Sequence, residues 1–279
     1  MKWQGRQGSS NVEDKRGKSK GLLGGGIGTI IIIIVIYLLG GDPSGIMQNA
    51  TDPSNQTTEE YNPSAKEQEL AEFSSVVLKE TEDTWTKLFN EQGKSYRCPK
   101  LVLFSDAVQS GCGAASANSG PFYCPADEKV YINLQFFEEL GSRYGAPGDF
   151  AMAYVIAHEV GHHVQLLLGI NKKYESYRNR LSETEFNKMT VRLELQADYF
   201  AGVWAHYAER MNLLEEGDLE EALNAASAVG DDRLQKKSQG HVNPDTFTHG
   251  TSEQRSRWFM KGFRSGDMNG GDTFAASVL

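Results

Sequence analysis

The chain has 279 residues, and its 28 Lys and Arg against 37 Asp and Glu give a formal net charge of −9 at pH 7. This length can bury the core of one or two domains, so a globular protein is expected. A net negative charge is unfavourable for binding the phosphate backbone of nucleic acids, so we expect no nucleic-acid partner. The charge is also uneven, because residues 1–20 carry six basic and two acidic residues, a net +4 that leaves −13 for the other 259.

A single apolar run follows this basic segment. Residues 22–39 contain no charge. As a helix they would span about 27 Å, or about 30 Å with the flanking glycines, which is enough to cross a bilayer core. A cleaved signal peptide is the alternative, but its apolar core is usually only about 7–15 residues long. We therefore predict an uncleaved, single-pass signal anchor over residues 21–41 that contacts membrane lipid. Because positive residues favour the cytoplasmic side, residues 1–20 are predicted to be a basic cytoplasmic tail.

The rest of the chain divides into a linker and a folded domain. Residues 42–65 hold three prolines among Ser, Thr, Asn and Gln, a composition typical of a flexible linker. In residues 66–279, apolar residues recur with helical spacing, and the first predicted helix ends at Gly93. Short β-branched and aromatic runs indicate strands. The predicted fold class is α+β with a small antiparallel sheet. The strands are predicted at 101–104, 122–124 and 130–132, and C-terminal helices at 219–228 and 252–263.

Cys98, Cys112 and Cys124 are the cysteines of the chain. They could be three small buried hydrophobic residues, but a domain in an oxidising compartment favours one disulfide and one free thiol. Cys112 and Cys124 are the favoured pair because tight-turn residues lie between them, while the sequence leaves the pairing open. Cysteine ligation of zinc is disfavoured, because the chain has no C-x-x-C pattern.

A metal-binding pattern lies at His158 to His162, which reads His-Glu-Val-Gly-His in a predicted helix from Asp149, its expected cap, to Gly169. Residues four apart lie on one helix face, so both imidazoles can bind one Zn²⁺ at about 2.0–2.1 Å. Glu159 is placed to take a proton from a metal-activated water. Chance gives this pattern in about one of a hundred such chains, so the pattern alone is informative but not decisive. The alternative is a pair of ordinary helical histidines.

A second predicted helix offers a third ligand. It begins at the capping box of Ser182 and Glu185, and it carries Glu194 and Asp198. These two acids are also four apart, on a stripe of small residues that lets another helix approach closely. Glu194 can therefore reach the metal while Asp198 accepts the free ring N–H of a ligand histidine. The alternative interpretation is an acidic pair on a solvated helix face.

The motifs resemble those of one known family. The chain is similar to the neutral zinc metallopeptidases of bacteria over nearly its whole length, in residues 1–6, 11–14, 120–125, 158–163, 194–198 and 249–252. More distantly, an H-E-x-x-H helix paired with an E-x-x-x-D helix resembles the gluzincins, in which two His and one Glu hold the metal. A metzincin pattern is excluded, because no suitably spaced third histidine follows His162.

The resemblance implies a zincin-like domain with one zinc ion per chain. It implies His158, His162 and Glu194 as the zinc ligands, Glu159 as the general base, and Asp198 as the partner of a ligand histidine. These roles agree with those that the helical spacing suggests.

His249 and Arg255 are the remaining catalytic candidates. Thr251 and Gln254 form a capping box that puts His249 just ahead of a helix. The membrane-linked zinc peptidases carry a similar Thr-His-Pro segment with an Arg six residues after the His, whereas this chain has Gly250 in place of the proline. A hydrolytic zinc site needs a donor for the oxygen that becomes negative in the tetrahedral intermediate, and we predict that His249 or Arg255 supplies it. The alternative for His249 is a loop residue bonded to its own turn.

These features predict a membrane-anchored zinc endopeptidase that hydrolyses peptide bonds with a zinc-activated water and Glu159 as the base. Its metallopeptidase domain, residues 66–279, is expected on the periplasmic or extracytoplasmic side of the bacterial inner membrane, with peptides or proteins as substrates. The alternative is a catalytically silent zinc-binding scaffold tethered to the membrane. Glu159 argues against a scaffold, because a structural zinc site needs no base. The sequence predicts no particular oligomeric state.

Overall fold

The structure is a computed structural model that describes residues 1–17 and 61–279. Met1–Lys15 and Ser64–Leu279 form one compact unit, and Arg16–Pro63 are assigned to a second. The predicted anchor and the predicted linker up to residue 60 lie outside the described residues. Within the described ranges, no helix is both long and apolar enough to cross a membrane.

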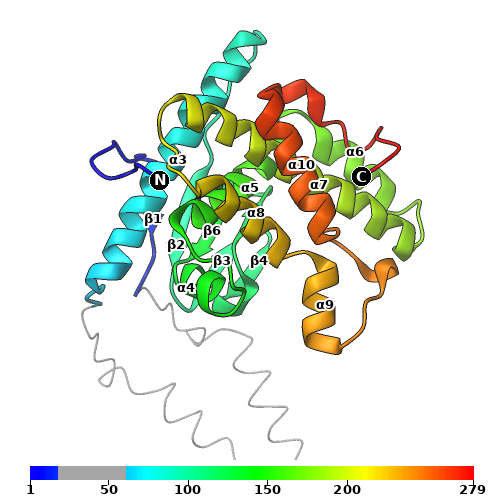
Figure 1. Ribbon diagram of the computed structural model, residues 1–279, viewed down its shortest axis with the longest axis horizontal. Helices are drawn as coiled ribbons and strands as arrows, with labels where there is room; N and C mark the ends of the chain where they lie inside the picture. Colours follow the sequence, from blue (N-terminus) through cyan, green and yellow to red (C-terminus); the bar gives the residue numbers. More distant parts are fainter. Residues whose placement is uncertain (18–60) are drawn as a thin grey trace, which may run out of the picture. The chain divides into compact units, whose positions relative to one another are not determined.

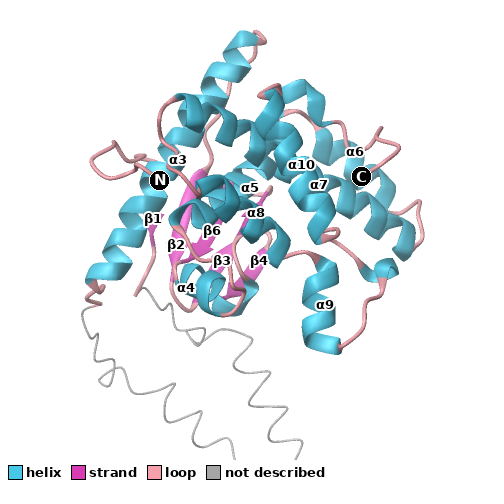
Figure 2. Cartoon of the chain, viewed as in Figure 1, coloured by secondary structure: helices cyan, strands magenta, loops and turns pink. Residues whose placement is uncertain are grey.

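The larger unit combines short strands with long helices, which confirms the α+β class (Figures 1 and 2). Its strands are β1 (Val12–Asp14), β2 (Lys100–Phe104), β3 (Ala107–Ser110), β4 (Gly113–Ser116), β5 (Phe122–Cys124) and β6 (Lys129–Asn133). Its α-helices are α3 (Ala65–Glu91), α4 (Gln135–Ser142), α5 (Asp149–Leu167), α6 (Ile170–Arg178), α7 (Glu183–Arg210), α8 (Asp218–Ala228), α9 (Asp231–Gln239) and α10 (Ser252–Ser265). Short 3₁₀ turns lie at Ala117–Ser119, Pro244–Thr246 and Met268–Gly271.

A mixed four-stranded sheet has the order β1-β2-β6-β5. β1 is parallel to β2 and β2 to β6, whereas β5 is antiparallel to β6 at the edge. The prediction of a wholly antiparallel sheet is therefore wrong, although its β5–β6 hairpin is present. The reason is the long connection from β2 to β6, which holds the separate β3–β4 hairpin and lets the chain re-enter the sheet in the same direction.

Residues 1–15 are part of this unit. β1 pairs with β2 along its whole length, and the side chains of Met1 and Trp3 are buried in the main hydrophobic core. The predicted boundaries, with a separate tail at 1–20 and a domain that begins at residue 66, are therefore wrong for the first fifteen residues. Strand pairing and apolar burial between segments far apart in sequence outweigh the basic composition on which the prediction rested.

The basic groups of this segment contact acidic residues of the domain. Arg6 forms an ion pair with Glu80 at 3.1 Å, and the amino group of Met1 lies 2.7 Å from the carboxylate of Asp149. Part of the positive charge that predicted a cytoplasmic tail is thus neutralised within the fold.

Helix starts follow the sequence signals with one exception. Capping boxes begin α3 at Ser64, α7 at Ser182 and α10 at Thr251. The cap of α5 is Gly148, with φ 120°, and Asp149 is the first helical residue. The prediction of Asp149 as a cap is wrong, because its carboxylate binds the amino terminus of the chain.

The helix α5 lies at the centre of the helical layer, where it packs against α7 and α8 (Figure 1). Gly161 of α5 faces the backbone of α7, and a Cβ atom added there would lie 2.9 Å from the carbonyl oxygen of Ala197. The two helix axes can therefore approach closely. This contact brings together the side chains that α5 and α7 present to each other.

Candidate metal centre

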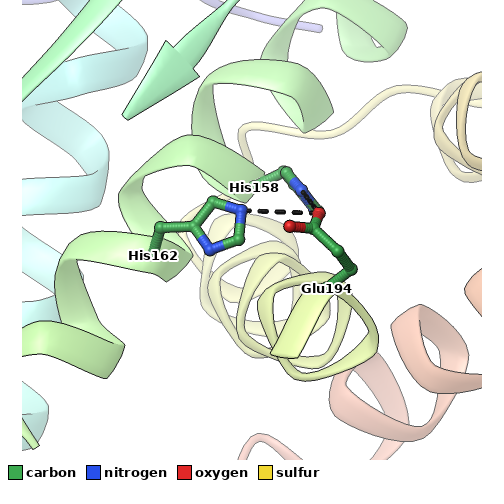
Figure 3. Close-up of side chains that lie close together, drawn as sticks. All are labelled: His158, His162 and Glu194. Atoms are coloured by element: carbon green, nitrogen blue, oxygen red, sulfur yellow. Dashed lines mark hydrogen bonds and ion pairs between the residues drawn. The ribbon is translucent and has the colours of Figure 1, made fainter. Parts of the chain in front are cut away.

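Three side chains from two helices converge on one point. His158 and His162 project from the same face of α5, and Glu194 reaches them from α7 (Figure 3). The Oε2 atom of Glu194 lies 3.2 Å from His158 Nε2 and 3.5 Å from His162 Nε2. The structure thus brings together the three ligands that the sequence suggested.

The spacing of these atoms fits a zinc ion. Tetrahedral Zn²⁺ with bonds of about 2.0–2.1 Å separates its ligand atoms by about 3.3 Å, close to the distances between Glu194 and the two imidazoles. One candidate ligand atom from each of the three residues lies within 4.8 Å of the others. Two imidazoles and one carboxylate are also a donor set that zinc prefers, and three protein ligands leave a position for water.

Each ligand imidazole is oriented by a second contact. His158 Nδ1 lies 2.8 Å from Asp198 Oδ1, so Asp198 is where the sequence suggested. His162 Nδ1 lies 2.9 Å from Gln165 Oε1, whose amide in turn donates to the backbone carbonyl of Leu193 on α7. Because the Nδ1–H group of each ring donates to a fixed oxygen, each Nε2 atom is directed at the metal position.

Asp198 is the centre of a buried polar network. Its carboxylate accepts hydrogen bonds from the Tyr154 hydroxyl at 2.5 Å, from Arg255 Nε at 2.8 Å and from Arg255 Nη2 at 3.0 Å. Arg255 is only 3 % exposed, and it also donates to the Tyr154 hydroxyl. This geometry favours a positioning role for Arg255, through Asp198 and His158, over the predicted role at the transition state.

The charges of the site favour a bound cation. Burial lowers the pKa of His158, but the nearby carboxylates of Asp198 and Glu194 outweigh this effect and raise it to about 9. Burial raises the pKa of Glu194, but the two histidines hold it well below its usual 4.5. The site therefore contains an ionised carboxylate, and a metal that binds there has to displace protons from the imidazoles.

A cavity of about 510 Å³ opens over the three ligands. Glu159 lines it beside the metal group but is not part of that group, as expected for a base rather than a ligand. His249 also lines the cavity, so the structure brings this predicted residue to the same site. Strand β5 contributes Phe122 and Tyr123 to the wall.

Asp231 holds the loop that carries His249. Its Oδ2 atom accepts the backbone N–H groups of Thr248, His249 and Gly250 at 2.7, 2.6 and 2.9 Å. Its Oδ1 atom lies 3.5 Å from His249 Nδ1, and Thr248 Oγ1 lies 3.0 Å from that nitrogen. Burial lowers the pKa of His249, but the contact with Asp231 outweighs this effect, so the pKa is raised above 6.5.

Three of these positioning residues, Tyr154, Gln165 and Asp231, were not predicted from the sequence. Tyr154 and Gln165 lie four residues before His158 and three after His162, so the helical period could have put them on the ligand face. Asp231 has no comparable signal, because its contact with His249 joins two segments 18 residues apart through a loop.

A disulfide joins Cys112 and Cys124, the pair that the sequence favoured. It ties the turn between β3 and β4 to the end of β5, the strand that lines the cavity. Cys98 is free and exposed. His163 points away from the metal position, where its ring bridges the Tyr123 hydroxyl and the carbonyl oxygen of Arg97.

Comparison with known proteins agrees with this geometry. The family described as "Putative neutral zinc metallopeptidase" matches residues 1–274. The chain is 50% identical over 289 residues to "Uncharacterized protein YpfJ" of Escherichia coli strain K12, with 100% of both chains covered. It is 44% identical over 195 residues to "Uncharacterized protein Rv2575" of Mycobacterium tuberculosis strain H37Rv, which covers 66% of this chain and 65% of that protein. No solved structure matches the chain. The chain belongs to the neutral zinc metallopeptidase family.

Proposed function

We propose that this protein is an endopeptidase that uses one zinc ion, held by His158, His162 and Glu194, to hydrolyse peptide bonds. The observation that carries this proposal is the joint position of the three ligands and Glu159 in one open cavity. A scaffold with a structural zinc would need neither the base nor the open cavity.

In the proposed reaction, different residues of the site activate the water, stabilise the negative oxygen and orient the zinc ligands. When bound, zinc lowers the pKa of water toward about 7 and polarises the scissile carbonyl. The carboxylate of Glu159 accepts the proton of the attacking water and delivers it to the nitrogen of the leaving amine. His249, whose Nδ1 atom faces Asp231 and Thr248, keeps Nε2 for the carbonyl oxygen that becomes negative. Asp198, Arg255 and Gln165 fix the orientation of the ligand imidazoles.

An extended peptide suits the shape of the site. β5 is an edge strand of the four-stranded sheet, and two of its residues line the cavity. An edge strand offers backbone donors and acceptors to a peptide that lies alongside it. Such pairing recognises a peptide backbone of any sequence, which supports an endopeptidase.

We also propose that the protein is attached to the bacterial inner membrane by its apolar run at 22–39. β1 and β2 are neighbours in one sheet, so residues 1–15 and 64–279 have to lie on the same side of a membrane. One crossing between them would separate the two strands, so the single-pass topology with a cytoplasmic N-terminus does not fit this sheet. The Cys112–Cys124 disulfide favours the extracytoplasmic side for both parts, because disulfides persist in oxidising compartments.

The test is zinc content and peptide hydrolysis of the purified full-length chain. We expect one zinc per chain, and hydrolysis of an unstructured protein such as casein that stops with a chelator and returns with zinc. Glu159→Gln should keep the zinc and lose about 10²–10⁴-fold in rate, whereas His158→Ala should lose the zinc. A Glu159→Gln variant with unchanged hydrolysis, or a His158→Ala variant with a full equivalent of zinc, would overturn the proposal.

A further inference from the structure

A second cavity of about 270 Å³ adjoins the metal cavity, because Tyr144 and Leu234 line both. The rest of its wall is formed by Ala228 and by three cationic side chains of α9. The cations are Arg233, Lys236 and Lys237. A basic cavity therefore lies beside the cleft over the metal position.

The three cations share one helix face and are only partly used by the fold. Positions 233, 236 and 237 are three and four residues apart, so their side chains project in one direction. The Lys237 ammonium group donates to the carbonyl oxygen of Arg143. Within residues 1–17 and 61–279, the side chains of Arg233 and Lys236 form no hydrogen bond or ion pair with another residue.

Helix stability does not explain this cluster. Lys236 and Lys237 lie in the last turn of α9, where cations favour the helix dipole. Arg233 lies in the first turn of the same helix, where a positive charge is unfavourable. Arg233 is therefore placed against the dipole, in a chain whose net charge is −9. The side chains of Arg233, Lys236 and Lys237 are exposed, so their charges are accessible to an anionic ligand in the adjoining cavity.

We propose that this basic cavity is a substrate subsite that binds a carboxylate of the peptide. The carboxylate comes either from an Asp or Glu side chain or from the C-terminus of the peptide. The planar guanidinium of Arg233 can bind a carboxylate with two parallel hydrogen bonds, and Lys236 adds a second charge. The inference rests on the proposed function, since it assigns a specificity to the same cleft.

The experiment measures both hydrolysis and binding with one set of peptides. A cleavable peptide of neutral residues is the parent, and a single Glu is moved through four positions on either side of the scissile bond. Each peptide is made with a free and with an amidated C-terminus, which separates the two sources of the carboxylate. Binding is measured by fluorescence anisotropy with the full-length Glu159→Gln variant, and this arm does not depend on turnover.

We expect one Glu position, or the free C-terminus, to improve kcat/KM by about tenfold, or about 1.4 kcal/mol. The gain should lie in KM, because the contact is the same in the ground state and the transition state. It should shrink in 0.5 M NaCl, because salt screens exposed charges. The double variant R233Q/K236Q should lose the preference for the acidic peptide. Its kcat for the neutral parent peptide should equal that of the unsubstituted chain.

A matched control removes two charges elsewhere. Lys94 and Arg264 are exposed and line neither cavity, so K94Q/R264Q should keep the preference. Equal loss in both double variants would indicate a general charge effect and overturn the subsite. Equal binding of acidic and neutral peptides by the Glu159→Gln variant would also overturn it. Selective binding without hydrolysis by the unsubstituted chain would retain the subsite and refute the endopeptidase.

Discussion

Asp198 orients a candidate ligand imidazole without being a candidate ligand itself. Asp198 has no exposed surface, yet its carboxylate is ionised between the Arg255 guanidinium and the His158 imidazole. A buried carboxylate of this kind is tolerated only while it is paired and hydrogen-bonded. The orientation of His158 therefore depends on a residue that contributes no metal ligand.

Arg255→Gln should destabilise the protein because it leaves the buried Asp198 carboxylate without its cation. We expect the free energy of unfolding to fall by about 3–5 kcal/mol and the zinc affinity to fall with it. Urea denaturation and zinc titration measure the two effects. Arg264→Gln, on the exposed end of the same helix, is the control and should change stability by less than about 0.5 kcal/mol. Equal stability of the two variants would refute the role of the network.

Zinc affinity should rise with pH because zinc competes with protons for the imidazoles. The pKa of His158 is about 9, so this imidazole is protonated at pH 7 before zinc binds. Each proton released should make the apparent affinity rise about tenfold per pH unit below that pKa. Calorimetry of zinc binding in two buffers of different ionisation enthalpy counts the protons. A pH-independent affinity between pH 6 and 8 would contradict this prediction.

At the scale of secondary-structure elements, the packing of α5 against α7 determines whether His158, His162 and Glu194 lie close together. α5 carries two of the proposed zinc ligands and α7 carries the third, so the distance between the helices sets the distance between their side chains. Gly161 is the residue that permits their approach, because a Cβ at this position would lie 2.9 Å from the Ala197 carbonyl oxygen and 3.1 Å from its Cα.

Gly161→Ala should therefore push α5 and α7 apart. We expect a loss of stability of about 1–3 kcal/mol from overpacking and weaker zinc binding, since the ligands come from both helices. Thermal unfolding with and without zinc measures both. Gly141→Ala is the matched control: its Cβ would meet Pro147 at an ordinary 3.6 Å, and alanine favours the helix. If both variants bind zinc as the parent does, helix spacing does not control the site.

The disulfide and β5 form another such pair. Cys124 ends β5, and the bond to Cys112 fixes this edge strand to the β3–β4 turn. On the other side, the Tyr123 hydroxyl contacts His163 of α5 at 2.9 Å. Strand β5, which lines the cavity, is thus linked covalently to the β3–β4 hairpin and by a hydrogen bond to α5.

At the scale of the whole molecule, the first fifteen residues restrict the topology. They form a strand, bury two apolar side chains and supply ion pairs to a domain that resumes at residue 64. A chain that folds in this way keeps both segments on one side of any membrane.

Cysteine accessibility tests this arrangement in cells. In a Cys98→Ser background, which keeps only the disulfide, Gln7→Cys and Lys94→Cys put single thiols on exposed positions of the two segments. We expect a membrane-impermeant maleimide, added to cells with a permeabilised outer membrane, to label both positions equally. Labelling of position 94 alone would restore the single-pass topology and contradict the pairing of β1 with β2.

Much of the metal centre could be predicted because its signals are local. His158 and His162, and likewise Glu194 and Asp198, lie four residues apart, so the helical period places each pair on one helix face within five consecutive residues. The capping boxes of α7 and α10 are equally local, since each involves residues three apart. For these features, neighbours in the chain are also neighbours in space.

Other features depend on contacts between distant segments. Arg255 meets Asp198 across 57 positions and His158 across 97, so its sequence context gave no sign that its charge is neutralised. The pairing of β1 with β2 joins residues about ninety positions apart, and the basic cavity beside the metal site exists only because α9 packs there. By itself, the sequence determined the α+β class, the family and the three candidate ligands that the structure brings together, because these depend on local patterns. Only the tertiary structure decided the mixed sheet, the place of the N-terminal segment and the contacts of Arg255, because these depend on which distant groups are buried together.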